Sequence, residues 1–317
     1  MKVLLTVDVE IWLDDWDMRP ESFRDGFRRF ILGETGGEAK GVPYQLERLR
    51  AHDLKCVFFV EPLFACHFGI DPLRDIVSMI QDCGQEVQLH PHTEWNGFMR
   101  ERIVPGRHGV NLRDFTTDEQ LRLVERGREN LLRAGARSPT AFRAGNFGAG
   151  SQTLGVLRQL GIEYDSSYDL AATTGPFLDR RLLCPAVVDG IKEFPIAVFE
   201  TSGGGYRHAQ VAAASFEEVA AALMRAHADE WPAFVVFWHS AELLDRTRRG
   251  ASAIAARRFS RLLELLAADR DRFETVHFAD LAESNGLYGK VVDRPPRLST
   301  YPTLRRHVEQ VCQRFGF

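Results

Sequence analysis

The chain has 317 residues, of which 44% are hydrophobic and 26% are charged, and its formal net charge is −4 at pH 7. This length suits one large domain or two ordinary ones. The acidic balance and the lack of a nucleic-acid-binding motif argue against a nucleic-acid partner. The five cysteines are scattered and form no CxxC pair, which argues against a disulfide framework and against a cysteine zinc site.

The N-terminal apolar run is short. It covers residues 3–7 and ends on Asp8, so it does not have the length of the hydrophobic region of a signal peptide. No later run approaches the ~20 apolar residues that a membrane-spanning helix needs. The sequence therefore predicts a cytoplasmic protein without a membrane span.

Apolar segments alternate with amphipathic ones along the chain. We predict strands over residues 2–9, 56–60, 86–90, 139–143, 162–165, 194–199, 233–238 and 273–278. Their apolar residues run continuously, which is typical of parallel strands covered on both faces. Repeated strand–helix units predict one α/β domain, and seven or eight such strands suit a parallel barrel. In such a barrel, chemistry gathers at the C-terminal ends of the strands.

Local signals mark the helices between these strands. Thr116 and Glu119 form a capping box, as do Ser215 and Glu218, because the two side chains of each pair can satisfy free backbone N–H groups reciprocally. A third helix is predicted over residues 254–268, which are rich in leucine.

Two segments do not follow the strand–helix repeat. Residues 12–41 are an insertion after the first strand, rich in Trp and Phe. Such a loop either lines a substrate site or covers the barrel mouth with helices. The tail over residues 286–317 begins with turn residues, and we expect a helix over 303–317 that serves packing or oligomer contacts. We therefore divide the chain into a barrel over 1–285 and a C-terminal extension over 286–317, with the oligomeric state left open.

The first candidate site residues are Asp8 and Glu10. Side chains two residues apart on a strand share a face, so both carboxylates can point into one cavity. One of them can bind a metal while the other acts as a base. The alternative is a pair of solvated charges at a strand end.

His90, His92 and Glu94 form a second cluster with the same spacing. If the segment is extended, all three side chains face the same way; if a helix begins at Pro91, His90 and Glu94 meet as an i, i+4 pair. Imidazole and carboxylate together suit zinc and other first-row metals. The alternative is hydrogen-bonded histidines of structural role.

Arg143 and His239 complete the set of candidates. Arg143 precedes a glycine-rich segment over residues 144–150 and can orient a catalytic carboxylate, although an ordinary strand-to-helix turn has the same pattern. A phosphate-binding loop is disfavoured because neither GxGxxG nor a GKS or GKT ending is present. His239 ends an apolar strand and is either a general acid or a structural residue. The histidines at 67, 108, 208 and 277 have no such context and are interpreted as structural.

Taken in order, these segments resemble the polysaccharide-deacetylase family, also called the NodB-homology domain or carbohydrate esterase family four. The resemblance spans roughly residues 1–285. The matching segments are Thr6-Val7-Asp8-Val9-Glu10, His90-Pro91-His92-Thr93-Glu94, Phe142-Arg143-Ala144-Gly145-Asn146-Phe147, Tyr164-Asp165-Ser166-Ser167, Glu193-Phe194-Pro195 and Trp238-His239-Ser240.

The resemblance implies a distorted (β/α) barrel of about seven parallel strands and metal-dependent hydrolysis of an N-acetyl group. By this likeness Asp8 is the general base and Arg143 holds it. A divalent metal, expected to be Zn²⁺, and a backbone N–H near Asn146 would stabilise the oxyanion. His239 would protonate the departing amine.

The sequence departs from the family pattern at two positions. The second Asp of the first motif is Val9 here, and the second metal-binding His is Glu94 here. Some members of the family have Asp-x-Asp or Asp-x-Glu, so Glu10 is the expected substitute ligand. The expected metal ligands are therefore Glu10 and His90, with His92 or Glu94 completing the set. A more anionic site of this kind should raise the pKa of bound water, and it makes loss of the metal an alternative.

Three functions are compatible with these patterns. The first is N-deacetylation of a small carbohydrate, or of a nucleotide- or lipid-linked sugar precursor in surface-polysaccharide synthesis. The second is hydrolysis of a cyclic amide or ureide on the same fold without a metal. The third is a catalytically inactive, carbohydrate-binding barrel, which the joint presence of Asp8, Arg143 and His239 disfavours.

Overall fold

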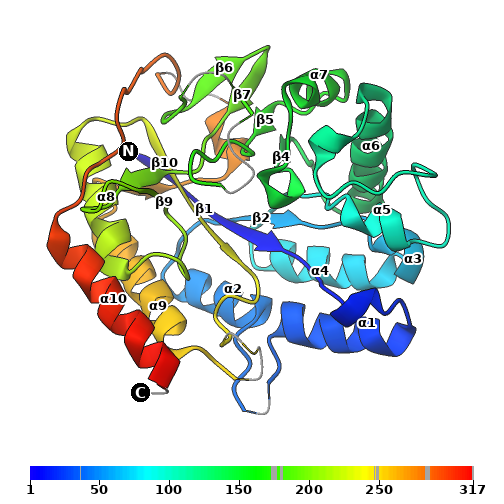
Figure 1. Ribbon diagram of the computed structural model, residues 1–317, viewed down its shortest axis with the longest axis horizontal. Coiled ribbons are helices and arrows are strands. Elements are labelled where there is room, and N and C mark those ends of the chain that lie inside the picture. Colours follow the sequence, from blue (N-terminus) through cyan, green and yellow to red (C-terminus); the bar gives the residue numbers. More distant parts are fainter. Residues whose placement is uncertain are drawn as a thin grey trace.

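A curled, mostly parallel sheet forms the centre of the molecule (Figure 1). The computed structural model describes residues 1–35, 37–172, 177–178, 181–245, 247, 250–282 and 286–315, with backbone only for 310–315. The sheet has the strand order β10-β1-β2-β3-β4-β5-β7-β6, and β11 pairs with β1 beside this path. Its strands are β1 (Lys2–Val9), β2 (Val57–Val60), β3 (Glu86–Leu89), β4 (Ala141–Phe142), β5 (Tyr164–Asp165), β6 (Ala186–Val188), β7 (Ile191–Glu193), β10 (Ala233–His239) and β11 (Glu274–Thr275).

The path from β10 to β7 consists of seven strands, and each pairs with its neighbours in parallel. Within the described part of this sheet, only the pairing of β6 with β7 at the edge is antiparallel. The predicted α/β barrel of about seven parallel strands is therefore confirmed.

Burial on both faces explains the continuous apolar strands. In β1 every residue from Val3 to Val9 is buried. Val3, Leu5, Val7 and Val9 belong to the main core beneath the helices, whereas Leu4 packs with residues such as Val57 and Phe237 in a second core. This split follows the alternation of side chains along a strand. β1 thus needs apolar residues at nearly every position.

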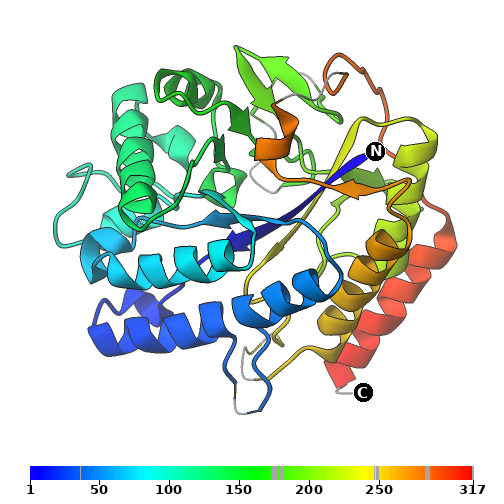
Figure 2. The same ribbon diagram turned by 180° about the vertical axis from the view of Figure 1, so that it is seen from behind.

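Helices surround the sheet (Figures 1 and 2). They are α1 (Pro20–Phe27), α2 (Val42–Ala51), α3 (Ala65–Phe68), α4 (Asp71–Asp82), α5 (Glu94–Phe98), α6 (Thr117–Arg133), α7 (Ser151–Gln159), α8 (Phe216–Ala228), α9 (Ala253–Ala268) and α10 (Thr300–Phe315). Both capping boxes are formed, with Thr116 and Glu119 at the start of α6 and Ser215 and Glu218 at the start of α8.

One predicted strand is wrong. The expected strand over residues 194–199 is divided, because β7 ends at Glu193 and β8 (Val198–Glu200) begins only after Pro195. Proline has no N–H to donate to a sheet and restrains the residue before it, so the ladder stops there. β8 instead pairs with β9 (Tyr206–His208) as an antiparallel hairpin, which was not predicted.

The insertion over residues 12–41 contains α1 and a π-helical turn over Arg28–Leu32. Phe23 of α1 stacks on Phe68 with ring centroids 4.1 Å apart, and it also contacts Phe64. The insertion therefore packs as a helical cover on the segment after β2. Of its residues, only Gly36 lies outside the described part of the chain.

The C-terminal helix α10 lies along α8 and α9 (Figure 1). Two buried ion pairs hold it there: Arg306 Nε lies 3.2 Å from Glu218 Oε1, and Arg258 Nη2 lies 2.7 Å from Glu309 Oε2. The helix begins at Thr300, three residues before the predicted start. The proposed boundary at residue 285 falls within 283–285, outside the described residues, and stays a prediction.

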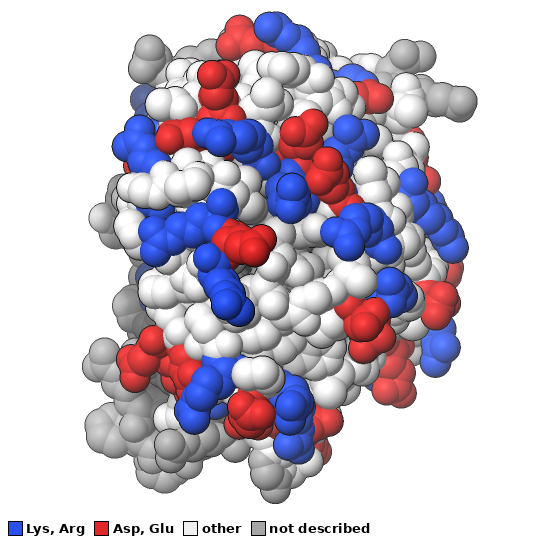
Figure 3. All heavy atoms as spheres, turned by 90° about the vertical axis from the view of Figure 1, so that its right-hand side faces the viewer, with Lys and Arg blue, Asp and Glu red and all other residues white. Residues whose placement is uncertain are grey.

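The surface carries charges of both signs. On the face seen in Figure 3, Lys and Arg side chains are interspersed with Asp and Glu. Among the described residues, no helix is long and apolar enough to cross a membrane.

Candidate active site

The sheet brings the predicted site residues to one edge. In the parallel pairing of β1 with β10, Asp8 lies opposite His239. Leu89 of β3 lies opposite Phe142 of β4, so the residues that follow each of them are also neighbours. His90 and Arg143 therefore meet, and His90 Nδ1 lies 2.8 Å from the carbonyl oxygen of Arg143. All these residues stand at the C-terminal ends of their strands, where a parallel barrel holds its chemistry.

Glu10, His90 and His92 converge on one point. Glu10 Oε1 lies 3.0 Å from His90 Nε2 and 2.9 Å from His92 Nε2, and the two Nε2 atoms are 3.2 Å apart. The three residues are buried, with His90 and His92 each 2% exposed. His90 and His92 thus face the same way, as the extended alternative predicts for them, whereas Glu94 begins α5 and contacts the opposite side of the His92 ring. The i, i+4 pair of His90 with Glu94 is not formed.

The outer nitrogens of both imidazoles have acceptors. His90 Nδ1 contacts the Arg143 carbonyl, and His92 Nδ1 lies 3.3 Å from Glu94 Oε2. With each Nδ1 donating its proton outward, each Nε2 presents a lone pair to the centre. Two lone pairs and a carboxylate oxygen at this spacing repel one another unless a proton or a metal ion lies among them.

This donor set fits a divalent metal. Ligands about 2.0–2.1 Å from a tetrahedral zinc ion lie roughly 3.3 Å from one another. The observed separations of 2.9–3.2 Å are close to that value. Two imidazoles and one carboxylate are also a ligand combination that zinc accepts while keeping an open position.

Trp12, in the insertion over residues 12–41, covers the cluster of Glu10, His90 and His92. Its Nε1 donates to Glu10 Oε2 over 2.7 Å, and its ring meets that of His92 edge-on with centroids 4.8 Å apart. The second oxygen of Glu10 is therefore engaged, and Oε1 alone faces the two histidines.

Two further carboxylates support His92. Glu94, at the start of α5, contacts His92 Nδ1 and accepts a hydrogen bond of 2.6 Å from Asn146 Nδ2. Glu61, just after β2, accepts hydrogen bonds from the backbone N–H groups of His92 and Leu63. Burial raises the pKa of Glu61 to about 8. Glu94 thus lies behind His92, on the side away from Glu10.

Asp8 and Arg143 form a buried ion pair. Arg143 Nη1 lies 2.6 Å from Asp8 Oδ1, and their side chains are 0% and 1% exposed. Asp8 Oδ2 is buried without a hydrogen-bond partner among the described residues. An oxygen of Asp8 also lies within 4.8 Å of ligand atoms of Glu10 and His239. One oxygen of Asp8 is thus fixed while the other is free to take a proton.

The remaining donors of Arg143 are also fixed. Its Nη2 donates to Thr6 Oγ1 and to Ser166 Oγ, each over 3.0 Å, and its Nε donates to the Ser166 carbonyl over 3.1 Å. The turn over residues 165–168 is held in turn by Asp165, which accepts from the backbone N–H and hydroxyl of Ser167. Hydrogen bonds therefore fix the position and orientation of the Arg143 guanidinium.

His239 lies beside Glu10 of this cluster. Its Nε2 lies 3.8 Å from Glu10 Oε1, and its Nδ1 lies 2.6 Å from Glu242 Oε1. Burial lowers the pKa of His239, but Glu10 and Glu242 raise it more strongly, to about 10. The ring is about one-third exposed, so a protonated His239 can meet a leaving group.

Electrostatic interactions within the cluster shift the pKa values of Glu10 and His92. Burial alone would raise the pKa of Glu10, but the nearby His92, His239 and His90 hold it well below the usual value. Burial likewise lowers the pKa of His92, and Glu10 and Glu94 together raise it well above the usual range. Glu10 is therefore ionised at neutral pH.

Several site residues were not predicted from the sequence. Glu61, Glu242, Ser166 and Trp12 all contact a predicted site residue, yet none lies in a recognisable metal or nucleophile pattern. The position of Glu61 directly after a buried strand is the one signal that could have identified it. At Asn146, the backbone is left-handed, with φ of 57°, and Phe147 follows with φ of 51°.

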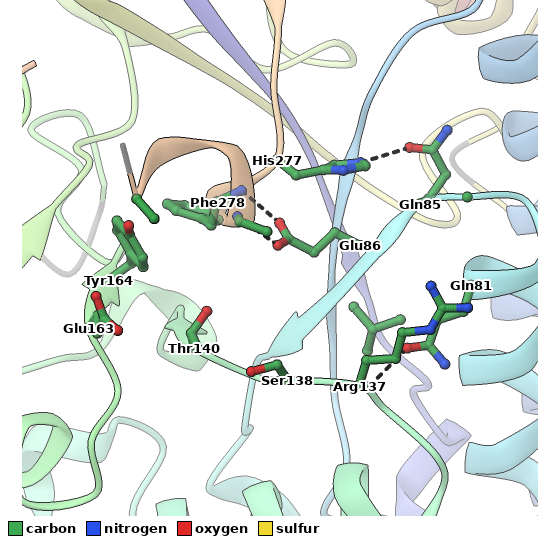
Figure 4. A pocket seen from close by; sticks show the side chains of 14 residues that line it. Gln81, Gln85, Glu86, Arg137, Ser138, Thr140, Glu163, Tyr164, His277 and Phe278 are labelled. Atoms are coloured by element: carbon green, nitrogen blue, oxygen red, sulfur yellow. Dashed lines mark hydrogen bonds between the residues drawn. The ribbon is translucent and has the colours of Figure 1, made fainter. Parts of the chain in front are cut away.

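A pocket lies at the opposite end of the strands (Figure 4). It has a volume of about 350 Å³ and is lined by residues near the N-terminal ends of β3, β4 and β5. Its carboxylates have internal partners: Glu86 accepts from the backbone N–H groups of Phe278 and Ala279, and Glu163 pairs with Lys192. This pocket holds none of the predicted site residues.

The fold is similar to several solved structures. A protein from Mycobacterium smegmatis designated a polysaccharide deacetylase is 19% identical, with 93% of this chain and 94% of that chain covered and a TM-score of 0.58. A 4-alpha-glucanotransferase from Thermococcus litoralis is 10% identical, covering 90% of this chain and 39% of that chain, with a TM-score of 0.53. A family 4 carbohydrate esterase from Streptomyces lividans, in complex with acetate, is 12% identical over 89% of this chain and 93% of that chain, with a TM-score of 0.47.

No protein-family profile and no curated protein matches the sequence. At identities below one-fifth, the likeness to solved structures concerns the fold, and one fold supports several reactions. The order of the motifs and the architecture nevertheless agree. The chain therefore has the (β/α) fold of the polysaccharide deacetylases.

Proposed function

We propose that this protein is a metal-dependent amide hydrolase that removes the acetyl group from an N-acetylated sugar. One observation carries the proposal: Asp8 Oδ2 is buried without a hydrogen-bond partner among the described residues, while Arg143 holds Oδ1 and an oxygen of Asp8 lies within 4.8 Å of ligand atoms of Glu10 and His239. A free carboxylate oxygen next to three convergent metal donors is what activation of a water molecule requires.

Asp8 acts as the general base in this proposal. Arg143 keeps Oδ1 in place, so Oδ2 is the oxygen that accepts the proton of the attacking water. Arg143 is therefore a positioning residue for Asp8, and Thr6 and Ser166 position Arg143 in turn.

Glu10, His90 and His92 are the proposed metal ligands, and Zn²⁺ is the metal that suits them. Glu94 orients His92 through Nδ1, as carboxylates behind metal-binding histidines do. When bound, such a metal would polarise the acetyl carbonyl and lower the pKa of a coordinated water.

His239 is the proposed general acid. Glu242 binds Nδ1 and thereby directs Nε2 toward the centre, where the amine leaves. With its pKa raised to about 10, His239 carries a proton at neutral pH. The backbone N–H of Asn146 is proposed to donate to the oxyanion, in the manner of other preorganised donors.

The proposed substrate is a small carbohydrate or a nucleotide- or lipid-linked sugar with an N-acetyl group. The polar residues of the candidate site and the fold, which is similar to that of a protein designated a polysaccharide deacetylase, support a sugar substrate. The test is acetate release from N-acetylated mono- and oligosaccharides and from nucleotide-linked sugars, with added Zn²⁺ and after chelation. Asp8→Asn should lose at least about 100-fold in rate. Asp25→Asn, at an exposed position of α1, should not.

Three outcomes would replace this proposal. Equal rates for the wild type and Asp8→Asn would remove Asp8 as the base. Hydrolysis of cyclic amides or ureides that survives chelation would indicate the metal-independent alternative. Sugar binding without turnover at any metal would indicate a carbohydrate-binding barrel.

A further inference from the structure

His208 forms a dyad with a buried carboxylate at the rim of the candidate active site. Its Nδ1 lies 2.8 Å from Asp169 Oδ2. Asp169 follows β5 and its side chain is 0% exposed, whereas the side chain of His208 is 24% exposed. The other oxygen of Asp169 accepts from the backbone N–H of Ala171 over 2.8 Å. A buried carboxylate is costly unless it is paired, and His208 supplies the pairing side chain.

The dyad lies one aromatic ring away from the proposed catalytic groups. The ring of Phe237 meets that of His208 edge-on at 5.1 Å and that of His239 at 5.8 Å. The guanidinium of Arg143 lies 5.9 Å from the same ring. The ring of Phe237 is therefore a common neighbour of His208, His239 and Arg143.

The residues after His208 lie next to the end of β10. Ala209 and Val211 exchange backbone hydrogen bonds with Phe237 near the end of β10. Gln210, two residues after His208, contacts His239 and Glu242 through its side chain. The backbone N–H of Gln210 donates to the His208 carbonyl over 2.9 Å, so a tight turn joins His208 to this contact with His239.

Asp169 fixes the chemistry of the His208 ring. A proton on Nδ1 donates to the carboxylate, which leaves Nε2 as the other hydrogen-bonding atom. Nε2 has no hydrogen-bond partner among the described residues, and the ring is partly exposed. A histidine of purely structural role would more commonly have both nitrogens satisfied inside the protein.

We propose that His208, held by Asp169, is a substrate-binding residue whose Nε2 hydrogen-bonds a hydroxyl group of the sugar that bears the acetamide. This inference rests on the proposed function and extends it, because it makes the enzyme selective for polyhydroxylated amides over simple acetamides. Sites built to hydrogen-bond a substrate hydroxyl discriminate against analogues that lack it.

The decisive variant is His208→Asn. Its side-chain amide can still donate to Asp169 in place of Nδ1, but nothing replaces Nε2. His227→Asn, at a half-buried position of α8, is the matched control. Binding of N-acetylglucosamine and of its monodeoxy analogues is measured by calorimetry on the zinc-loaded full chain, with Asp8→Asn in every arm to prevent turnover.

We expect His208→Asn to weaken N-acetylglucosamine binding about tenfold, the value of one hydrogen bond. The chain that retains His208 should bind one monodeoxy analogue about tenfold more weakly than N-acetylglucosamine. The His208→Asn chain should bind that analogue and N-acetylglucosamine with equal affinity. His227→Asn should leave all affinities unchanged. Equal affinities of the His208→Asn and His208 chains would overturn the inference.

A second variant covers the case in which His208→Asn does not fold. In His208→Gln the amide reaches the Nε2 position without the bond to Asp169, so discrimination against the same deoxy analogue should persist. Its loss in a folded His208→Gln chain would also count against the inference. Failure of the proposed function is distinguishable, because it appears as absent acetate release by the wild type while these binding differences remain.

Discussion

Arg143 Nη1 lies 2.6 Å from Asp8 Oδ1 in an ion pair from which solvent is excluded, and only one of the two carboxylate oxygens takes part. The pair connects the C-terminal ends of β1 and β4, which are three strands apart in the sheet order. Asp8 is thus held from across the barrel, and the consequences of removing either partner can be measured.

Replacing Arg143 by Ala should destabilise the fold strongly. The substitution leaves the carboxylate of Asp8 buried without its partner, and breaking a buried pair in this way costs about 3–5 kcal/mol. The free energy of unfolding from urea denaturation measures the loss. In the double variant with Asp8→Asn, the loss should be smaller than the sum of the single losses, because the unpaired charge is gone. Strict additivity would show that the two residues do not stabilise each other.

Ser166→Ala should lower turnover through Arg143. It removes the hydroxyl that accepts from Arg143 Nη2 and donates to the Phe194 carbonyl over 2.9 Å. We expect kcat to fall by roughly fivefold with KM little changed, since one hydrogen bond contributes about 1 kcal/mol. Ser166→Thr keeps the hydroxyl and should restore most of the rate. A fall in kcat that Thr does not restore would indicate a packing defect.

Glu94→Gln should weaken metal binding without removing a ligand. Glu94 contacts Nδ1 of His92 rather than the centre, and loss of such an orienting carboxylate typically costs 10–100-fold in affinity. X-ray absorption on zinc-loaded protein should show two imidazole ligands in both the wild type and Glu94→Gln. His92→Ala, by contrast, should lose one of them. A lower coordination number in Glu94→Gln would make Glu94 itself a ligand.

Metal affinity should rise with pH across neutrality. Burial lowers the pKa of His92, but Glu10 and Glu94 raise it well above 6.5. The metal-free chain therefore holds a proton on His92 at neutral pH, and a metal ion must displace it. Affinity should increase until the pH exceeds this raised pKa and then level off. Competition titrations with a zinc chelator between pH 6 and 9 measure it, and a flat profile would contradict the proposed role of His92.

Much of the fold could be predicted from local patterns. The apolar run of β1 and the capping boxes at Thr116 and Ser215 depend on residues adjacent in sequence, and all three match the structure. β4 and β5 have two residues each, too few for any periodicity to define. Pro195 indicates a break in the strand, and the continuous strand predicted over 194–199 does not take this proline into account.

The candidate site divides in the same way. Asp8, Glu10, His90 and His92 lie at strand ends and were identifiable by spacing. His208 has no strand-end or motif context in the sequence, and its partner Asp169 is 39 residues away. Ser166 lies in a segment that carries the family resemblance, but its contact with Arg143 depends on the pairing of β4 with β5. Such contacts follow from the sheet and carry no local signal.

The register that places Asp8 opposite His239 has a further consequence for how this protein can change. The spacing between the two residues is set by backbone hydrogen bonds between adjacent strands, about 4.8 Å apart, and by no loop. Loops around the barrel mouth can therefore lengthen, shorten or be exchanged while the distance between Asp8, the proposed general base, and His239, the proposed general acid, stays constant. A change of register by one residue, in contrast, would turn one of the two side chains to the opposite face and end the chemistry at once.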